Sequence, residues 1–302
     1  MGKTGLIHNL FYYLQGEQKE WECIYIDIYA TKSLADFVRV LTREVVTKLA
    51  SPIQRIGSNI TNLLRGIKLT MEFDPITNQP QWGVGFQPQE AMQTLDGVFQ
   101  FLKTIDQSVV IAIDEFQQIK EYPEQIVEAL LRTHIQNAHN VRFIFSGSKQ
   151  HLMSDIFSSA KRPFFQSTEK MNLYSIDEST YYDFASYWMT KKNIELPKDT
   201  FHILYQQFDG HTWYLQYVLN LLYSDSSSVI TPQELNNVIY CILQREKEAF
   251  QAMYDKLTDN QTAVLRAIAK EGIVKAINAG DFIKKYKLKG SSSVNKALEY
   301  LL

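Results

Sequence analysis

The stretch VVIAIDE, residues 109–115, has the pattern of a buried strand that ends in two acids. Five apolar residues precede Asp114 and Glu115, and burying an unpaired carboxylate costs free energy. The two acids are better placed at the carboxyl end of a parallel strand, where sites form in open α/β sheets. There Asp114 would hold the hydration shell of a metal ion, and Glu115 would act as a general base toward water. The alternative is a strand that ends at a solvated acidic turn.

A second motif lies at the start of the chain, where Gly2, Lys3 and Thr4 match the last three positions of the phosphate-binding loop G-x-x-x-x-G-K-[ST]. In that loop the lysine contacts the β- and γ-phosphates, and the hydroxyl binds Mg²⁺. The 302-residue sequence does not contain the front half of the motif. We therefore expect Met1 to be an internal methionine, and ATP hydrolysis to occur if the native protein has that front half. Together the two motifs predict a nucleoside triphosphatase that binds ATP with Mg²⁺.

Three further residues are candidates for the same site. Ser146 follows an apolar strand and could sense the γ-phosphate, although a simple Ser/Gly turn explains it equally well. Arg162 is a candidate to neutralise charge in the transition state, against the alternative of a surface arginine. His211 joins two predicted helices and could face the nucleotide, against a structural role at the junction.

The order of the predicted elements indicates an α/β fold. Strands and long helices alternate in the first half of the chain, which favours a parallel sheet that lacks its first strand. The pattern predicts helices at 3–16, 33–50, 88–105 and 123–138, strands at 21–28, 108–114 and 141–146, and an inserted β-hairpin at about 67–86. Helices alone follow, at 177–192, 198–208, 212–223 and 232–254. We divide the chain into an ATPase core (1–175), a helical lid (176–255) and a partial winged helix-turn-helix (256–302).

The charge distribution singles out the C-terminal segment. The whole chain has a formal net charge of −2, but residues 256–302 contain nine Lys or Arg and four Asp or Glu, which leaves −7 on the remainder. Short helices predicted at 259–270, 279–287 and 291–302, with a tight turn at 288–290, resemble a helix-turn-helix. The chain ends where a winged helix would place its hairpin. This basic module could bind DNA or a protein.

Other compositional features predict the compartment. Cys23 and Cys241 lie in apolar stretches, and we expect both to be buried thiols. No apolar run approaches the roughly 18 residues of a membrane span, and no signal peptide is recognisable. These features predict a cytoplasmic protein without a membrane partner.

At this point the residues resemble a known family. The chain resembles the archaeal-type ATPases in five segments. They are Gly2-Lys3-Thr4, IAIDEFQ (111–117), FIFSGS (143–148), Arg162-Pro163-Phe164 and the junction GHTWYLQ (210–216). That family belongs to the STAND and AAA-like class of P-loop ATPases. The resemblance covers nearly the whole chain and implies an α/β core, a helical lid and a C-terminal winged helix. It also implies ATP and Mg²⁺ binding at Gly2, Lys3, Thr4, Asp114 and Glu115.

Three hypotheses remain open on the sequence alone. The first is a Mg²⁺-dependent ATPase that acts as a switch between ATP and ADP states, with an unknown protein partner. The second is a DNA-binding regulator that acts through 256–302. The third is a protein-interaction scaffold with a degenerate nucleotide site. A sheet without its first strand would also have an exposed edge, which favours association into a homo-oligomer.

Overall fold

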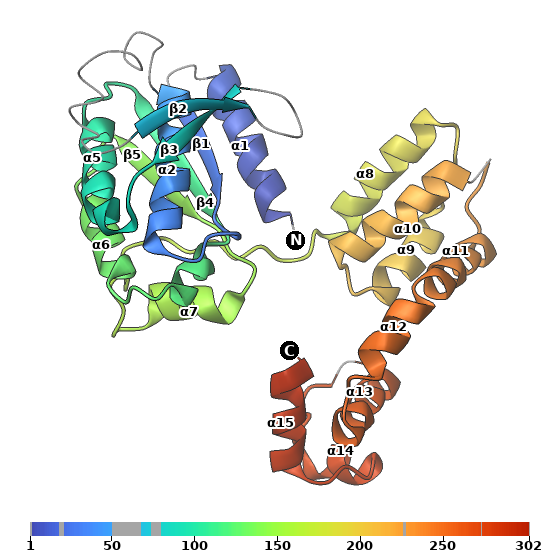
Figure 1. The fold of residues 1–302 in the computed structure, drawn as a ribbon. Helices are drawn as coiled ribbons and strands as arrows, with labels where there is room; N and C mark the ends of the chain where they lie inside the picture. Colours follow the sequence, from blue (N-terminus) through green and yellow to red (C-terminus); the bar gives the residue numbers. More distant parts are fainter. Residues whose placement is uncertain are drawn as a thin grey trace. The chain divides into compact units, whose positions relative to one another are not determined.

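A computed structural model of the chain describes residues 2–17, 21–49, 68–73, 80–225, 228–272 and 274–301. The chain divides into two compact units, Met1–Tyr174 and Ser175–Leu302. The first unit contains the sheet and the helices that cover it, and the second is helical (Figure 1).

Three parallel strands form the sheet of the first unit, in the order β1-β4-β5. They are β1 (Trp21–Asp27), β4 (Ser108–Asp114) and β5 (Val141–Phe145). In the register of β1 and β4, Tyr25 lies opposite Ala112, and Asp27 lies opposite Asp114. The predicted parallel α/β sheet is confirmed, and both strands end at the same edge.

The two faces of β4 have different neighbours because side chains alternate along a strand. Val109, Ile111 and Ile113 face a large core built with the helices α2 and α5. Val110 and Ala112 face a smaller cluster with Ile7 and Phe11 of α1. Asp114 continues the second series, so the strand periodicity directs its carboxylate toward the side of the sheet that α1 covers.

Helices therefore cover both faces of the sheet (Figure 1). Their bounds are α1 (Lys3–Glu17), α2 (Leu34–Leu49), α5 (Ala91–Lys103), α6 (Val127–Gln136) and α7 (Gln150–Ser158), with 3₁₀ turns η1 (Pro88–Glu90) and η2 (Phe116–Glu121). The hydroxyl of Ser33 accepts from the backbone N–H of Asp36 at 3.2 Å, which caps α2. The helix predicted at 123–138 begins later than expected: residues 122–126 form bends and a turn, and α6 starts at Val127. Helix α7 was not anticipated.

A β-hairpin accompanies this unit, as expected. β2 (Lys68–Phe73) pairs antiparallel with β3 (Pro80–Gly85). We expected residues 74–80 to form the turn of the hairpin. Pro80 begins β3, and residues 74–79 lie outside the described residues. Val84 of β3 is buried in the core that contains α2.

The second unit contains two separate hydrophobic clusters. The first belongs to α8 (Glu178–Lys191), α9 (Lys198–Gln207), α10 (Thr212–Asp225) and α11 (Pro232–Arg245). The second belongs to α13 (Asp259–Glu271), α14 (Gly280–Lys285) and α15 (Ser291–Leu301). Between them in the sequence lies α12 (Lys247–Tyr254), which buries no residue.

Two expectations for this unit were wrong. The helix predicted at 232–254 is divided at Glu246 into α11 and α12. No Gly or Pro marks that position, so the sequence carries no local breaker signal. Cys241 is exposed on α11, whereas Cys23 is buried as expected.

Across the described ranges, no helix combines the length and the apolar character that crossing a membrane requires.

Candidate functional site at the end of β4

The carboxylate of Asp114 is the centre of a polar cluster at the end of the sheet. Its Oδ2 accepts hydrogen bonds from the Thr4 hydroxyl at 2.6 Å and from the Tyr25 hydroxyl at 2.8 Å. Its Oδ1 accepts from the backbone N–H of Glu115 at 3.0 Å. Only 5% of Asp114 is exposed. Residues 110 positions apart in the sequence thus meet at one carboxylate.

Two competing effects set the protonation of this cluster. Burial acts to raise the pKa of Asp114. Hydrogen bonds from Thr4, Tyr25 and the Glu115 backbone, together with the nearby Ser146 hydroxyl, outweigh burial and lower the pKa below its ordinary value. Burial, together with the neighbouring carboxylate, raises the pKa of Tyr25 to about 12. Asp114 is therefore ionised and Tyr25 protonated at neutral pH, which suits a donor–acceptor pair.

Lys3 and Thr4 begin α1, and the backbone carbonyl of Gly2 accepts from the Leu6 N–H at 2.9 Å. Gly2 has a φ of 93°, a conformation that favours glycine. The first N–H groups of a helix attract anions. Lys3 is partly buried and, within the described part of the chain, forms no ion pair. The contact of Thr4 with Asp114 therefore places the start of α1 beside this carboxylate.

Glu115 leaves the strand in the left-handed conformation, with φ 55° and ψ 38°. Non-glycine residues seldom adopt this conformation, and it concentrates at functional sites. The Oε2 atom of Glu115 accepts a hydrogen bond from the Gln117 amide and another from the Ser148 hydroxyl, the latter at 2.8 Å. The carboxylate is therefore held by one side chain from η2 and one from the loop after β5.

Ser146 lies beside the same cluster. Its backbone N–H donates to the Ile113 carbonyl at 2.9 Å, and its carbonyl accepts from the Phe116 N–H at 2.8 Å. The hydroxyl is buried and close enough to help lower the pKa of Asp114, although no described group lies within ordinary hydrogen-bonding limits of it. Ser146 thus joins Thr4, Asp114 and Glu115 at one edge of the sheet.

Arg162 takes part in an ion-pair network beside the core. Its guanidinium pairs with Asp155 at 2.8 Å and with Glu128 at 3.1 Å, and Lys120 pairs with Asp155 at 2.5 Å. Hydrogen bonds from Lys120 and Arg162 lower the pKa of Asp155, whereas burial raises the pKa of Glu128. The structure thus places Arg162 on carboxylates of its own chain, and its role toward a transition state stays a prediction.

His211 belongs to the second unit, at the start of α10. Its backbone N–H donates to the Phe208 carbonyl at 2.9 Å, and its ring lies 4.9 Å from that of Tyr214. The preceding Gly210 has a φ of 67°, and a Cβ there would lie 2.6 Å from the Tyr205 hydroxyl. These contacts serve the α9–α10 junction, and the nucleotide role of His211 also stays a prediction.

Three residues of the cluster were not assigned a role from the sequence: Tyr25, Gln117 and Ser148. A signal for Tyr25 did exist, because the period of two that places Asp114 beside α1 also places Tyr25 there. Gln117 lies in the short 3₁₀ turn η2, and Ser148 lies in the loop after β5. Neither segment has a long periodic pattern from which the direction of a side chain could be predicted.

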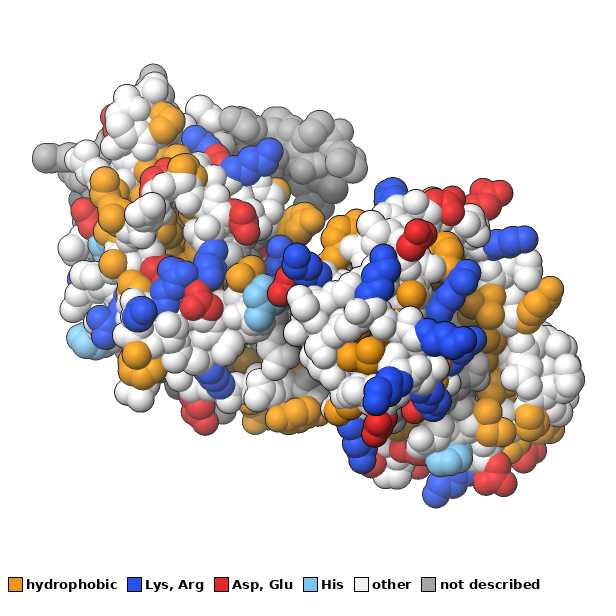
Figure 2. Space-filling view, turned by 90° about the horizontal axis from the view of Figure 1, so that it is seen from below, with side chains coloured by type: hydrophobic (Ala, Val, Ile, Leu, Met, Phe, Trp, Pro, Cys, Tyr) orange, Lys and Arg blue, Asp and Glu red, His pale blue; other side chains and the backbone are white. Residues whose placement is uncertain are grey.

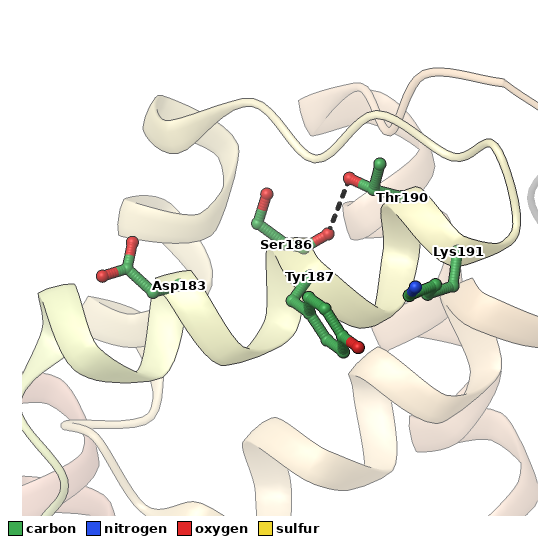
Figure 3. A pocket seen from close by; sticks show the side chains of 5 residues that line it. All are labelled: Asp183, Ser186, Tyr187, Thr190 and Lys191. Carbon is green, nitrogen blue, oxygen red and sulfur yellow. Dashed lines mark hydrogen bonds between the residues drawn. The ribbon is translucent and has the colours of Figure 1, made fainter.

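A surface hollow lies elsewhere, along α8. It has a volume of about 400 Å³ and is lined by Asp183, Ser186, Tyr187, Thr190 and Lys191 (Figure 3). The Thr190 hydroxyl donates to the Ser186 carbonyl at 2.8 Å. All five residues belong to one helix, so this is an open depression rather than an enclosed site. The polar cluster at Asp114 remains the stronger candidate for chemistry.

Comparison with known proteins agrees with this geometry. Residues 1–153 match the AAA domain family, and residues 248–302 match a probable winged helix domain. The chain belongs to the AAA family of P-loop ATPases, as its resemblance to archaeal-type ATPases with a C-terminal winged helix led us to expect. A comparison with curated proteins found no match.

Solved structures share the fold at low sequence identity. A Walker-type ATPase of Pyrococcus abyssi is 17% identical, with a TM-score of 0.57, over 98% of this chain and 81% of that chain. The ORC2 protein of Aeropyrum pernix, solved as ADPNP-ADP complexes, is 14% identical, with a TM-score of 0.56, over 99% and 75%. The ORC1 protein of A. pernix, in complex with DNA, is 10% identical, with a TM-score of 0.50, over 99% and 74%.

Proposed function

We propose that the protein is a Mg²⁺-dependent ATPase whose nucleotide state acts as a switch. The observation that carries the proposal is the contact of Thr4 with Asp114 at 2.6 Å. It brings the hydroxyl that follows the phosphate-binding lysine to the acidic end of β4. Membership of the AAA family supports nucleotide binding at a coarse level.

The donor set fits Mg²⁺ together with a nucleotide. Mg²⁺ prefers oxygen ligands and is held in such sites by one or two carboxylates plus substrate phosphates. Thr4 and Asp114 supply a hydroxyl and an ionised carboxylate. The described residues contain no cluster of three or more His, Cys, Asp or Glu that could hold a metal ion. When bound, the ion would neutralise charge on the phosphates.

The side chains of the cluster divide the remaining tasks. Lys3 and the first N–H groups of α1 would bind the phosphates. Asp114 and Thr4 would hold the metal and its waters, while Tyr25 orients the Asp114 carboxylate by its hydrogen bond. Glu115 would take a proton from the attacking water. Ser146 would contact the γ-phosphate, Arg162 would stabilise transition-state charge, and His211 would respond to the nucleotide.

A switch also requires parts that can move as bodies. The two units have hydrophobic cores of their own, and domains with independent cores commonly change their packing. We infer that nucleotide state alters the packing of the lid and the winged helix against the ATPase core.

Lys3→Ala tests this proposal by calorimetry. We expect ATP with Mg²⁺ to bind the wild type, and the variant to lose affinity by about tenfold or more, because a charge-assisted bond to phosphate contributes roughly 1.5–3 kcal/mol. Lys103→Ala, at an exposed lysine of α5, is the matched control and should bind as the wild type does.

The small-angle scattering profile of the wild type should differ between the complex with ADP and the complex with a non-hydrolysable ATP analogue. Absence of ATP binding, also in the chain extended wherever the reading frame continues upstream of Met1, would refute the proposal.

A second candidate function is DNA binding by the C-terminal module, favoured by the distribution of its lysines. Lys284, Lys287 and Lys289 are exposed, whereas Lys285 pairs with Glu271 at 2.6 Å. Figure 2 shows several Lys and Arg side chains, with Asp and Glu among them, on the face that it presents. Exposed lysines near a helix-turn-helix suit contacts with phosphates.

For this candidate we expect salt-dependent binding of duplex DNA. The double variant Lys287→Ala/Lys289→Ala should weaken binding on all sequences and reduce the salt slope by about one per lost phosphate contact. Lys285→Ala is the internal control with the smaller expected effect, because Glu271 already neutralises that lysine. Fluorescence anisotropy at two or more salt concentrations measures both quantities. Binding that is absent at low salt excludes this function.

A further inference from the structure

Gln117 has an unusual position beside Glu115. It lies in η2, two residues after Glu115, and only 4% of it is exposed. Its Nε2 donates a hydrogen bond to Glu115 Oε2. The opposite orientation of the amide would set its oxygen against a carboxylate oxygen, so this contact fixes which end of the amide faces Glu115.

The other end of the amide is packed against Gly147. The Oε1 atom of Gln117 is buried and has no hydrogen-bond partner among the described residues. A Cβ at position 147 would lie 2.2 Å from this oxygen and 2.6 Å from Met153 Sδ. A side chain at position 147 would therefore displace the amide or the Met153 side chain. The fold keeps Gln117 in place although a buried unpaired acceptor costs free energy.

The Ser148 hydroxyl donates to the same carboxylate oxygen as Gln117, at 2.8 Å. Glu115 Oε2 thus accepts two hydrogen bonds, whereas its Oε1 accepts none from the described part of the chain. A carboxylate held through one oxygen has a fixed plane and leaves its second oxygen free for a proton.

We propose that Gln117 is a positioning residue that, with Ser148, orients Glu115 so that Oε1 faces the attacking water. The inference rests on the proposed function, in which Glu115 is the general base. Three features then act together to hold the Glu115 carboxylate in this orientation. They are the left-handed backbone of Glu115, the absence of a side chain at Gly147 and the two donors on Oε2. Misplacing a reacting group by about 1 Å costs up to roughly 10²-fold in rate.

The test compares turnover with affinity. Gln117→Met keeps the length of the side chain and removes its donor. We expect kcat for ATP to fall about tenfold, which is less than the full rate contribution of a general base, because Glu115 is still present but less well oriented. KM and the Kd for ATP should stay within about twofold, because Gln117 contacts no residue assigned to phosphate binding. Gln118→Met is the matched control, since the adjacent amide donates to the Thr31 carbonyl instead. Gly147→Ala should lower kcat in the same direction by displacing the amide.

Two further measurements separate positioning from a general structural role. In a Glu115→Gln background, Gln117→Met should cause no additional loss, because the group that it orients is gone. Ser148→Ala should also lower kcat and Ser148→Thr should restore it. Ser148 is exposed, so these variants test the inference even if Gln117→Met fails to fold.

The outcomes distinguish the two proposals. If Glu115→Gln abolishes hydrolysis while Gln117→Met and Ser148→Ala keep the wild-type kcat, the positioning role is wrong and the ATPase assignment stands. An additional loss in the Glu115→Gln background likewise overturns the positioning role. If Glu115→Gln hydrolyses ATP at the wild-type rate, the ATPase mechanism itself is wrong, and the inference fails with it.

Discussion

Glu115→Gln should reduce ATP turnover by about 10² to 10⁴, the usual contribution of a positioned general base. The amide keeps the size of the side chain but cannot accept a proton from water. Because Glu115 contacts Gln117 and Ser148 rather than Lys3 or Thr4, the affinity for ATP should change by no more than a few fold. Phosphate release under saturating ATP measures turnover, and calorimetry measures affinity.

The matched control for this prediction is Glu121→Gln. Glu121 is the last residue of the 3₁₀ turn η2, which begins directly after Glu115. Its side chain is exposed, so the substitution should leave turnover unchanged. Equal turnover in the Glu115 variant and the wild type would contradict the assignment of the base. A parallel loss of turnover and of ATP affinity would indicate instead that Glu115 supports binding.

Phe116→Ala should lower the free energy of unfolding of the first unit by about 3–5 kcal/mol, the usual cost of removing a buried phenyl group. Phe116 is fully buried, and its ring lies 4.4 Å from that of Phe145, 5.7 Å from Phe157 and 5.8 Å from Phe164. Removing the ring leaves a cavity and ends contacts with all three neighbours. Urea denaturation followed by circular dichroism measures the change.

Tyr12→Ala provides the comparison for this prediction. Tyr12 lies on α1 and is 82% exposed, so its loss should change the free energy of unfolding by less than about 0.5 kcal/mol. If Phe116→Ala lowers the free energy of unfolding by less than about 1 kcal/mol, the packing of Phe116 against Phe145, Phe157 and Phe164 does not stabilise this edge of the sheet.

The sequence predicted the sheet well because strong local signals coincide with it. The run at 109–113 is apolar throughout and the two acids end it, so the strand, its burial and its carboxyl end are all visible in seven residues. The helices of the second unit were equally apparent from their spacing. The division at Glu246 was not, because it depends on packing: α11 buries Leu235 and Ile239, and α12 buries nothing.

The candidate site was predictable only in part. Motif spacing nominated Thr4, Asp114 and Glu115, and the structure brings all three to one edge of the sheet. The hydrogen bonds that hold Glu115 come from Gln117 and Ser148. They depend on the left-handed backbone conformation of Glu115, which the sequence does not indicate because the residue is not a glycine. Arg162 illustrates a different problem. Its partner Asp155 in α7 lies seven residues away, but Glu128 in α6 lies 34 residues away, and no sequence pattern showed that both carboxylates pair with the same guanidinium.

The alternation of neighbours along β4 limits which mutations this strand can tolerate. Val109, Ile111 and Ile113 face one core while Asp114 lies on the side of α1. Inserting or deleting one residue before Asp114 would reverse the parity of every side chain and drive the carboxylate into hydrocarbon. Substitutions can be accommodated one at a time, whereas the number of residues between the start of β4 and its acids cannot change by one.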